Sequence, residues 1–304
     1  GVIRAFLQSA GHRRATIGSW THDLSGNSFR GDGDRYRAVP SFEAQWEELL
    51  NFLDDVLRKN KPLGERVLRY YTMGERQWKA TSSWPVDGTV VEPWYLSAGG
   101  ELSTTPPSEP SGEDEYQVDD QVKSSTEPRW LGPLFSETWY PDRVERDTDL
   151  LTYQSGPLQA DMEVTGHPVI DLYLSSTHAD GTYIVYLESV SPQGVVTYVT
   201  EGILRGIHRK VSPAPDRWPA SVPYHSFLSV DAEDQKPGEI FQLKLALEPT
   251  SFLFREGHRI RIAIAGHDAA AFRRIPESGT PLLRFQRNAT HPSRIDLPVV
   301  RLPN

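Results

Sequence analysis

His22 is the residue whose type and position best suit catalysis. It follows a short run of strand-forming residues and a glycine, in the segment Ala15-Thr16-Ile17-Gly18-Ser19-Trp20-Thr21-His22-Asp23. An imidazole at such a strand-to-loop transition can take a proton from a serine hydroxyl and return it to a leaving group, because its pKa lies near neutrality. From the residues alone, His22 is either such a general base and acid or a structural loop histidine. Trp20 is a candidate for the substrate pocket, although packing is the commoner use of a tryptophan.

The partners that a catalytic histidine needs are not evident beside it. Asp23 is adjacent in sequence, but neighbouring side chains of an extended segment point to opposite sides, so it is poorly placed to orient the imidazole. Ser28 lies in Gly26-Asn27-Ser28-Phe29-Arg30-Gly31, which matches the pattern Gly-x-Ser-x-x-Gly. A nucleophile elbow requires a buried strand before the serine and a helix after it. The residues that follow, Asp32-Gly33-Asp34, are typical of a turn, and we interpret this segment as a loop.

Several further segments suggest a family for this chain. The residues around His22 resemble the Gly-Pro-Trp-x-His motif of the cocaine esterase, glutaryl acylase and X-prolyl dipeptidyl peptidase family of serine hydrolases. Segments similar to the family's other motifs follow in the family's order: Tyr70-Tyr71-Thr72-Met73-Gly74, Trp78, Trp94-Tyr95-Leu96, Leu172-Tyr173-Leu174-Ser175-Ser176, Gly257-His258-Arg259-Ile260-Arg261-Ile262 and His291-Pro292-Ser293-Arg294-Ile295. Together they extend over nearly the whole chain.

The resemblance implies an enzyme that cleaves ester or amide bonds through an acyl-enzyme. Members of the family combine a catalytic α/β-hydrolase domain, an inserted helical cap and a C-terminal jelly-roll domain, and this chain is similar to the last part. His22 would be the triad histidine, and the serine and the acid would precede Gly1 in an upstream catalytic segment, which is the expected partner. We therefore expect a processed, truncated or partial polypeptide that is inactive on its own.

Composition narrows the function classes further. The chain has 304 residues and a formal net charge of −9, which argues against nucleic acid or an anionic membrane as its main partner. No apolar run approaches the roughly 20 residues that a membrane span needs. The chain has no cysteine, so disulfides and thiol chemistry are excluded, and a cytoplasmic, soluble protein is favoured. We expect no metal and no other cofactor, because no His-Glu-x-x-His or similar ligand spacing occurs.

Residues 1–62 are predicted to be the C-terminal end of an α/β-hydrolase domain. Residues 2–10 have the apolar pattern of a helix end, and residues 14–18 that of a strand. A longer helix should begin after Ser41, whose side chain can cap it. Its apolar stripe recurs at intervals of three and four: Phe42, Trp46, Leu49, Leu53 and Val56. Helix, strand, loop and helix are how a doubly wound α/β domain would end, and we expect the last helix to pack against a core.

Residues 63–304 are predicted to form a jelly-roll β-sandwich, so that the chain as a whole is mainly β. Strand-like segments with a period of two lie at 66–73 and 90–96, and more follow at 158–164, 169–174, 183–190, 195–203, 241–247 and 259–265. The last of these alternates most clearly, with one aliphatic face and one polar or small face. Many short strands without intervening helices are typical of a sandwich. Residues 102–129 are rich in polar residues and predict a long surface excursion.

Other candidate residues favour structural roles. His258 and His291 adjoin strand-like segments, and we expect hydrogen-bonded structural imidazoles there. Asp32-Gly33-Asp34 has only the start of a calcium loop and is interpreted as a solvated turn. Aromatic residues are numerous enough to raise the idea of sugar stacking, but next to strands they favour core or interdomain packing. They include Trp78, Trp84, Trp94, Tyr95, Trp130, Trp139 and Tyr140.

Two classes of function remain open from the sequence. In the first, the chain is part of a serine hydrolase that acts on a small ester, amide or peptide substrate. In the second, it is a non-catalytic β-sandwich that binds or scaffolds, with carbohydrate as one conceivable ligand. A free α/β ending would expose the stripe of Phe42, Trp46, Leu49 and Leu53, which predicts either an upstream segment bound to it or association into a homo-oligomer.

Overall fold

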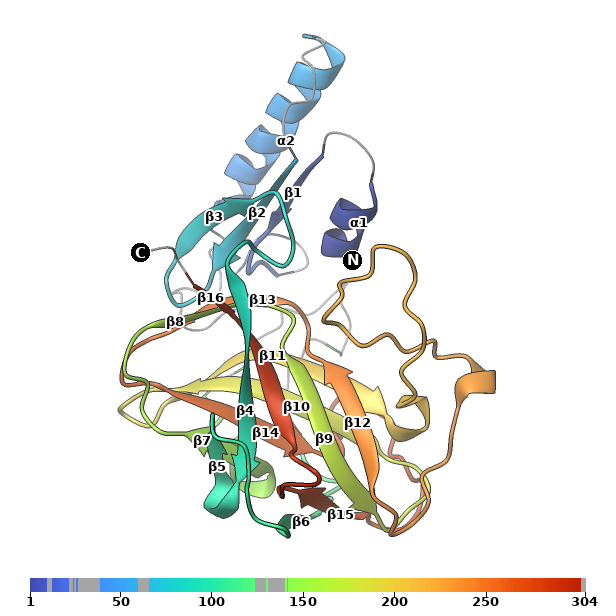
Figure 1. Cartoon of the computed structure of the whole chain (residues 1–304). Helices are drawn as coiled ribbons and strands as arrows, with labels where there is room; N and C mark the ends of the chain where they lie inside the picture. The colour runs from blue at the N-terminus through green and yellow to red at the C-terminus, as the bar shows by residue number, and fades with distance from the viewer. Residues whose placement is uncertain are drawn as a thin grey trace.

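A computed structural model describes residues 1–9, 13–21, 24, 26, 39–59, 66–123, 130, 140 and 142–301. Figure 1 shows a β-sandwich with a smaller α/β unit above it. Helix α1 (Val2–Gln8), strand β1 (Arg14–Ile17) and helix α2 (Phe42–Leu57) come first. The chain then returns to β1 with strands β2 (Val67–Thr72) and β3 (Gln77–Thr81) before it enters the sandwich.

The small unit is built on a three-stranded sheet with the order β1-β2-β3. β1 and β2 are parallel, with Ile17 opposite Tyr70, and β3 is antiparallel to β2. Helix α1 lies against this sheet through Ile3 and Phe6, which are buried together with Leu68 of β2 and with Trp84. β2 and β3 thus follow residue 62 in sequence but pair with β1 rather than with the sandwich. A strand-like period cannot reveal this, because it carries no information about the pairing partner.

Helix α2 begins where the sequence predicts it but does not pack as a core helix. The Ser41 side chain accepts a hydrogen bond from the Ala44 N–H at 3.4 Å, as expected for the cap. No residue of α2 is buried, and Trp46 is 48% exposed. Within the described residues α2 therefore has no core to pack on, and its apolar stripe is exposed as the sequence predicts for an α/β ending without an upstream segment. The apolar stripe faces outward, and Figure 1 shows α2 extending away from the sandwich.

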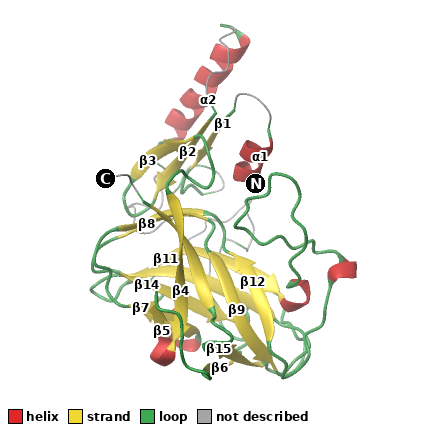
Figure 2. Cartoon of the chain, viewed as in Figure 1, coloured by secondary structure: helices red, strands yellow, loops and turns green. Residues whose placement is uncertain are grey.

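The sandwich is one large sheet that curls into two layers. Its strands are β4 (Thr89–Ser97), β5 (Glu101–Ser103), β6 (Glu113–Gln117), β7 (Leu151–Ser155), β8 (Met162–Gly166), β9 (Val169–Ser176), β10 (Thr182–Val190), β11 (Val196–Arg205), β12 (Phe241–Ala246), β13 (Thr250–Phe254), β14 (Arg259–Ala265), β15 (Leu282–Gln286) and β16 (Arg294–Val300). The main path runs β11-β10-β14-β7-β5-β4-β16-β9-β15-β6, and β12 pairs with β9. Figure 2 shows how strands dominate this region, with only short helical turns between them.

The core lies between the two layers. We call β4, β16, β9 and β12 the front layer, since they face the viewer in Figure 1, and β11, β10, β14 and β7 the back layer. Leu172 and Ile295 from the front layer and Leu187 and Ile262 from the back layer have no exposed surface and belong to one apolar cluster. The alternation in β14 places Ile262 inward and Arg261 outward, as the sequence predicts. The predicted class, a mainly β chain with a sandwich after a helix-strand-helix piece, is confirmed.

One predicted loop is in part a strand. The segment 102–129 was expected to be a surface excursion, but it contains β6, which pairs with β15 along its whole length. Tyr116 of β6 is buried, and so is Val118 just after it. The other β6 side chains are acidic or amide groups, and even Asp114, which accepts from the buried Tyr153 hydroxyl, is polar, so a single buried apolar position was too weak a periodic signal. Of this segment, residues 124–129 lie outside the described part.

A hydrogen-bonded joint connects the small sheet to the sandwich. Beyond the end of β2, the Met73 N–H donates to the Ser251 carbonyl at 2.9 Å, and the Leu253 N–H donates to the Met73 carbonyl at 2.9 Å. Next to this pair, the buried Ser251 hydroxyl lies 2.9 Å from the Thr72 hydroxyl and 2.8 Å from that of Thr165. The small unit is therefore fixed to β13 and β8 by both backbone and side-chain hydrogen bonds.

Candidate functional site

The turn after β1 is shaped by a close contact between Gly18 and Trp20. A Cβ atom on Gly18 would lie 2.7 Å from the Trp20 ring, so only glycine permits the indole to fold back over the strand end. The ring centroid of Trp20 is 5.7 Å from that of Trp78, and its Nε1 donates to the Val39 carbonyl at 3.1 Å. Trp20 therefore packs and also ties the end of β1 to the residues that precede α2.

Thr21 closes the loop that contains His22. Its N–H donates to the Gly26 carbonyl at 3.1 Å, and its hydroxyl accepts from the Gly26 N–H at 2.9 Å. The Leu24 N–H donates to the Thr21 carbonyl at 3.0 Å. Thr21 is buried, so these bonds are shielded from water. His22 itself lies outside the described residues, as do Asp23, Ser28 and the segment 32–34, but contacts on both sides of it are defined.

The first turn of α2 supplies a second anchor for this loop. The Gln45 side-chain amide donates from Nε2 to the Leu24 carbonyl at 3.2 Å and to the Pro40 carbonyl at 3.0 Å. One side chain thus joins both ends of the segment 24–40 to the helix. Sequence reasoning did not find Gln45, because nothing in its local pattern distinguishes it from other polar residues on the outer face of a helix.

A cavity of about 840 Å³ opens beside the turn. The small unit contributes Ile17, Gly18 and Trp20 to its lining, and the sandwich contributes residues 245–249 and the side chain of Phe227. A smaller hollow of about 150 Å³, lined by Ser19 and Tyr71, lies next to it. Trp20 therefore faces a space large enough for a small ligand, which agrees with its prediction as a pocket residue but does not test it.

The two histidines expected to be structural both have protein contacts within the sandwich. The His258 Nδ1 is 3.1 Å from the Ser189 hydroxyl, and burial together with nearby Arg255 lowers the pKa of His258. The His291 ring centroid lies 5.2 Å from that of Tyr173. These contacts agree with structural roles for both imidazoles.

The aromatic residues follow the packing expectation where they are described. Trp84, Trp94 and Tyr140 are buried. Trp78 stacks between Trp20 and Tyr71, since its ring centroid is 5.3 Å from that of Tyr71. Trp139 lies outside the described residues.

His167 is a histidine that sequence reasoning missed. It lines the large cavity, and its Nδ1 accepts a hydrogen bond from the Trp84 indole at 3.3 Å. Burial lowers the pKa of His167 to about 4. Its Nδ1 is thus occupied by the indole and its protonation is disfavoured by burial, which agrees with a packing role at this edge.

Taken together, fold and site define a class of protein. The small unit, with parallel strands β1 and β2, an anchored loop and helix α2, is the end of an α/β domain. The two-layered β-sandwich joined to it is the C-terminal β domain. Residues 64–296 match the model of the X-Pro dipeptidyl-peptidase C-terminal non-catalytic domain. The chain belongs to this family, as the resemblance found in the sequence predicted.

Relatives in sequence carry esterase names. A Mycobacterium bovis protein that carries a provisional serine esterase name is 43% identical over an alignment of 305 residues. The alignment covers 99% of this chain and 48% of that protein. The cocaine esterase of Rhodococcus sp. (strain MB1 Bresler) is 24% identical over 318 residues, 95% of this chain and 51% of the esterase. The chain thus spans about half the length of the curated relatives that it matches.

Solved structures share the fold. An aminopeptidase from a marine sediment archaeon, Thaumarchaeota archaeon, superposes with a TM-score of 0.75 at 17% identity, over 98% of this chain and 57% of that one. An α-amino acid ester hydrolase superposes with a TM-score of 0.71 at 21% identity, over 93% of this chain and 49% of that one. In the part of the chain that is described, no helix is both long and apolar enough to cross a membrane.

Proposed function

We propose that this chain is the C-terminal portion of a serine hydrolase that cleaves ester or amide bonds through an acyl-enzyme. In this scheme the serine hydroxyl of an upstream catalytic segment attacks the substrate carbonyl, and His22 takes the hydroxyl proton. The proton then passes to the leaving alcohol or amine as its bond to carbon breaks. A water molecule, deprotonated by His22, hydrolyses the acyl-enzyme.

One observation carries this proposal: the loop around His22 is anchored at the carboxyl end of a parallel strand. Catalytic groups of open α/β sheets gather at the carboxyl ends of the strands. Thr21, the residue before His22, is fixed by its hydrogen bond with Gly26. Leu24, two residues after His22, is fixed by the side chain of Gln45. Described residues on both sides of position 22 are therefore anchored, which in the proposed enzyme would limit the positions open to a catalytic side chain there.

The small unit also has the surface that an upstream segment would cover. Trp46, Leu49 and Leu50 of α2 are between 44% and 60% exposed. In the described pairings β1 has a strand partner on one side only, β2. Parallel strands occur almost always in sheets covered on both faces. We therefore propose that the catalytic segment with the serine and the acid adds strands next to β1 and packs on the stripe of α2.

In this assembly the β-sandwich acts as a scaffold. The joint between Met73 and Ser251 fixes the sandwich to the strand next to β1. Through this joint the sandwich would hold the His22 loop at a constant position relative to the serine. On its own, the chain would have no acyl-transfer activity, because it lacks the nucleophile.

The proposal is tested by ester hydrolysis with the enzyme that includes the upstream segment. His22→Ala should lower kcat by roughly 10³-fold or more, as expected for the loss of a triad member. His258→Ala is the matched control, since its imidazole contacts Ser189 within the sandwich, and it should change kcat little. A His22→Ala enzyme with wild-type kcat would overturn the role of His22.

A further inference from the structure

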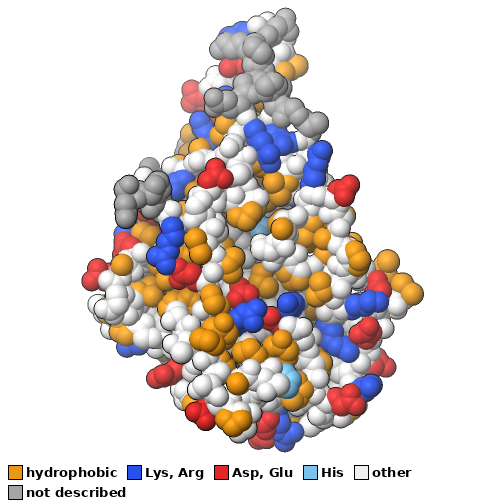
Figure 3. Space-filling view, viewed as in Figure 1, with side chains coloured by type: hydrophobic (Ala, Val, Ile, Leu, Met, Phe, Trp, Pro, Cys, Tyr) orange, Lys and Arg blue, Asp and Glu red, His pale blue; other side chains and the backbone are white. Residues whose placement is uncertain are grey.

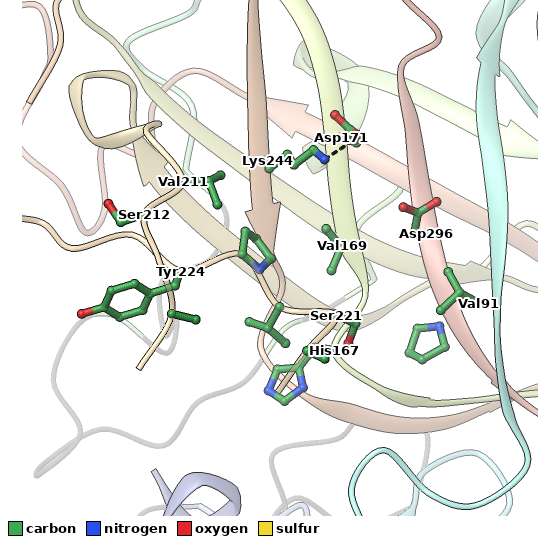
Figure 4. Close-up of a pocket in the computed structure, with 15 residues that line it drawn as sticks. Val91, His167, Val169, Asp171, Val211, Ser212, Ser221, Tyr224, Lys244 and Asp296 are labelled. Carbon is green, nitrogen blue, oxygen red and sulfur yellow. Dashed lines mark ion pairs between the residues drawn. The ribbon is translucent and has the colours of Figure 1, made fainter. Parts of the chain in front are cut away.

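A second cavity lies on the outer side of the front layer. Its volume is about 440 Å³, and it is enclosed between the sheet and a loop formed by residues 211–224 (Figure 4). The floor belongs to three adjacent strands, since β9 pairs with β12 on one side and with β16 on the other. Its size falls within the range of roughly 300–1,000 Å³ that is usual for small-molecule sites.

The loop over this cavity is braced by its own hydrogen bonds. The Ser212 N–H donates to the Tyr224 carbonyl at 2.8 Å, which closes the loop at its base. The ring of the buried His225 lies 3.0 Å from the Lys210 carbonyl and 3.0 Å from the Lys244 carbonyl of β12. The wall of the cavity is therefore attached to its floor.

Three charged side chains line the cavity, those of Asp171, Lys244 and Asp296, and Arg294 beside them pairs with both carboxylates. Asp171 is 2% exposed, and its Oδ1 accepts from the Gln242 amide at 2.6 Å while its Oδ2 lies 3.1 Å from Arg294 Nη2. Arg294 also donates through Nε to Asp296 Oδ1 at 2.9 Å. The Lys244 ammonium is 3.6 Å from Asp171 Oδ2, beyond hydrogen-bond distance. Asp171 is thus already satisfied by Gln242 and Arg294 without Lys244.

Lys244 and Asp296 each have one ion-pair partner and further hydrogen-bonding capacity. The Lys244 ammonium pairs with Asp171 Oδ2 at 3.6 Å and carries two further N–H groups. Asp296 accepts from Arg294 through Oδ1, and among the described residues no donor contacts its second carboxylate oxygen. Both residues line the cavity, with side chains 40% and 22% exposed. Figure 4 shows them on strands to either side of Val169, and Figure 3 shows acidic and basic side chains beside apolar ones on this face. The cavity therefore offers a cation and an anion on either side of a strand that contributes Val169 and Asp171 to its floor.

Lys244 and Asp296 stand on strands that are not neighbours. Strands β12 and β16 both adjoin β9, so their backbones are about 10 Å apart. A short peptide, whose two charges lie further apart than the adjacent carbons of a single α-amino acid, suits groups that stand on such strands. The charges of Lys244, Arg294, Asp171 and Asp296, which pair with one another, sum to zero, which favours a ligand without net charge.

We propose that this cavity binds a short peptide of two or three residues with free ends. Its carboxylate accepts hydrogen bonds from Lys244, and its ammonium group donates to Asp296. The peptide backbone lies over Val169, between these two side chains. This site would be a property of the sandwich itself, so it does not depend on the catalytic role proposed for His22.

The experiment is calorimetric titration of the full chain with trialanine, N-acetyl-trialanine and trialanine amide. Wild type should bind trialanine, and Lys244→Gln and Asp296→Asn should each weaken binding about tenfold or more, as is usual when a hydrogen bond to a charged group is lost. The amide should bind Lys244→Gln and wild type equally, and the N-acetyl peptide should bind Asp296→Asn and wild type equally.

Matched controls come from an exposed ion pair elsewhere. Lys236 and Glu239 are 77% and 67% exposed, so Lys236→Gln and Glu239→Gln should leave binding unchanged. Ala220→Trp fills the cavity without a change of charge and should abolish binding, with thermal unfolding as a check on folding in each variant. The proposal is overturned if wild type does not bind trialanine at millimolar concentration, or if the affinity is the same in all variants.

Discussion

At the scale of residues, His167 shows how burial decides the role of an imidazole. It accepts a hydrogen bond from the Trp84 indole, and its pKa is lowered to about 4 from an ordinary value of 6.5, chiefly by burial. As the pH falls, the unfolded chain therefore takes up a proton at His167 at a higher pH than the folded chain does. Folding stability from His167 is present above about pH 6.5 and is lost as the pH falls toward 4.

This predicts a measurable pH dependence. Between pH 6.5 and pH 4, wild type should lose about 2 to 3 kcal/mol more unfolding free energy than His167→Gln. Glutamine can still accept from Trp84 but does not titrate, so it separates the imidazole from all other groups. Urea unfolding at several pH values measures the unfolding free energy of both proteins. If this free energy changed with pH in the same way in wild type and in His167→Gln, His167 would not be the source of the pH dependence.

The residues of the candidate site differ in how far the sequence could reveal them. Gly18, Trp20 and His22 lie within one short segment, so their spacing could be read directly. Gln45 and His167 could not be found in this way. Their contacts join residues 21 and 83 positions apart, and such contacts depend on how separate elements pack.

At the scale of elements, the joint between β2 and β13 connects the two parts of the chain. The Ser251 hydroxyl is shared between Thr72 of β2 and Thr165 of β8, and all three residues are buried. Because water cannot replace a lost partner there, the joint should be sensitive to single changes. Among the described residues, the hydrogen bond to Ser251 is the side-chain hydrogen bond that joins Thr72 to the sandwich.

Ser251→Ala should lower the unfolding free energy by about 1 to 3 kcal/mol, since two buried hydroxyls lose a partner. Thr105→Ala, at an exposed threonine, is the matched control and should change it by less than about 0.5 kcal/mol. Chemical denaturation provides both values. Equal stability of the two variants would mean that the joint rests on its backbone hydrogen bonds alone.

Elements were predictable where the residue pattern alternates. In β14, Ile260 and Ile262 face the core while Arg261 lies on the opposite face beside Asp147 and Glu188, and the bounds of the strand agree with the sequence prediction. β6 was missed because only Tyr116 is buried within it. The sequence also could not show what α2 packs against. An amphipathic stripe indicates that a helix packs but not on what.

At the scale of the whole molecule, a buried ion cluster stabilises the back layer. Arg143 has no exposed surface, contacts Glu188 of β10, and donates to Asp147 at 2.9 Å. Its guanidinium also lies 4.0 Å from the centre of the Tyr186 ring. Removal of Arg143 would leave two buried carboxylates with Arg261 as their remaining cation, 3.4 Å from Asp147 Oδ2 and 3.6 Å from Glu188 Oε2.

Arg143→Met should therefore cost about 3 to 5 kcal/mol of unfolding free energy, the range found when one partner of a buried pair is removed. Arg273 pairs with Glu277 on the surface and is 79% exposed, so Arg273→Met should cost less than about 1 kcal/mol. Thermal and urea unfolding compare the two. A small effect at Arg143 would show that the carboxylates are satisfied in another way.

The central claim is that His22 activates a serine that lies outside residues 1–304. The most direct measurement is the reaction of the enzyme, with its upstream segment, with a fluorophosphonate probe, followed by mass spectrometry of the labelled peptide. We predict one adduct on an upstream serine in wild type and in His258→Ala, and none in His22→Ala. An adduct on Ser28, no adduct in wild type, or full labelling of His22→Ala would contradict the claim.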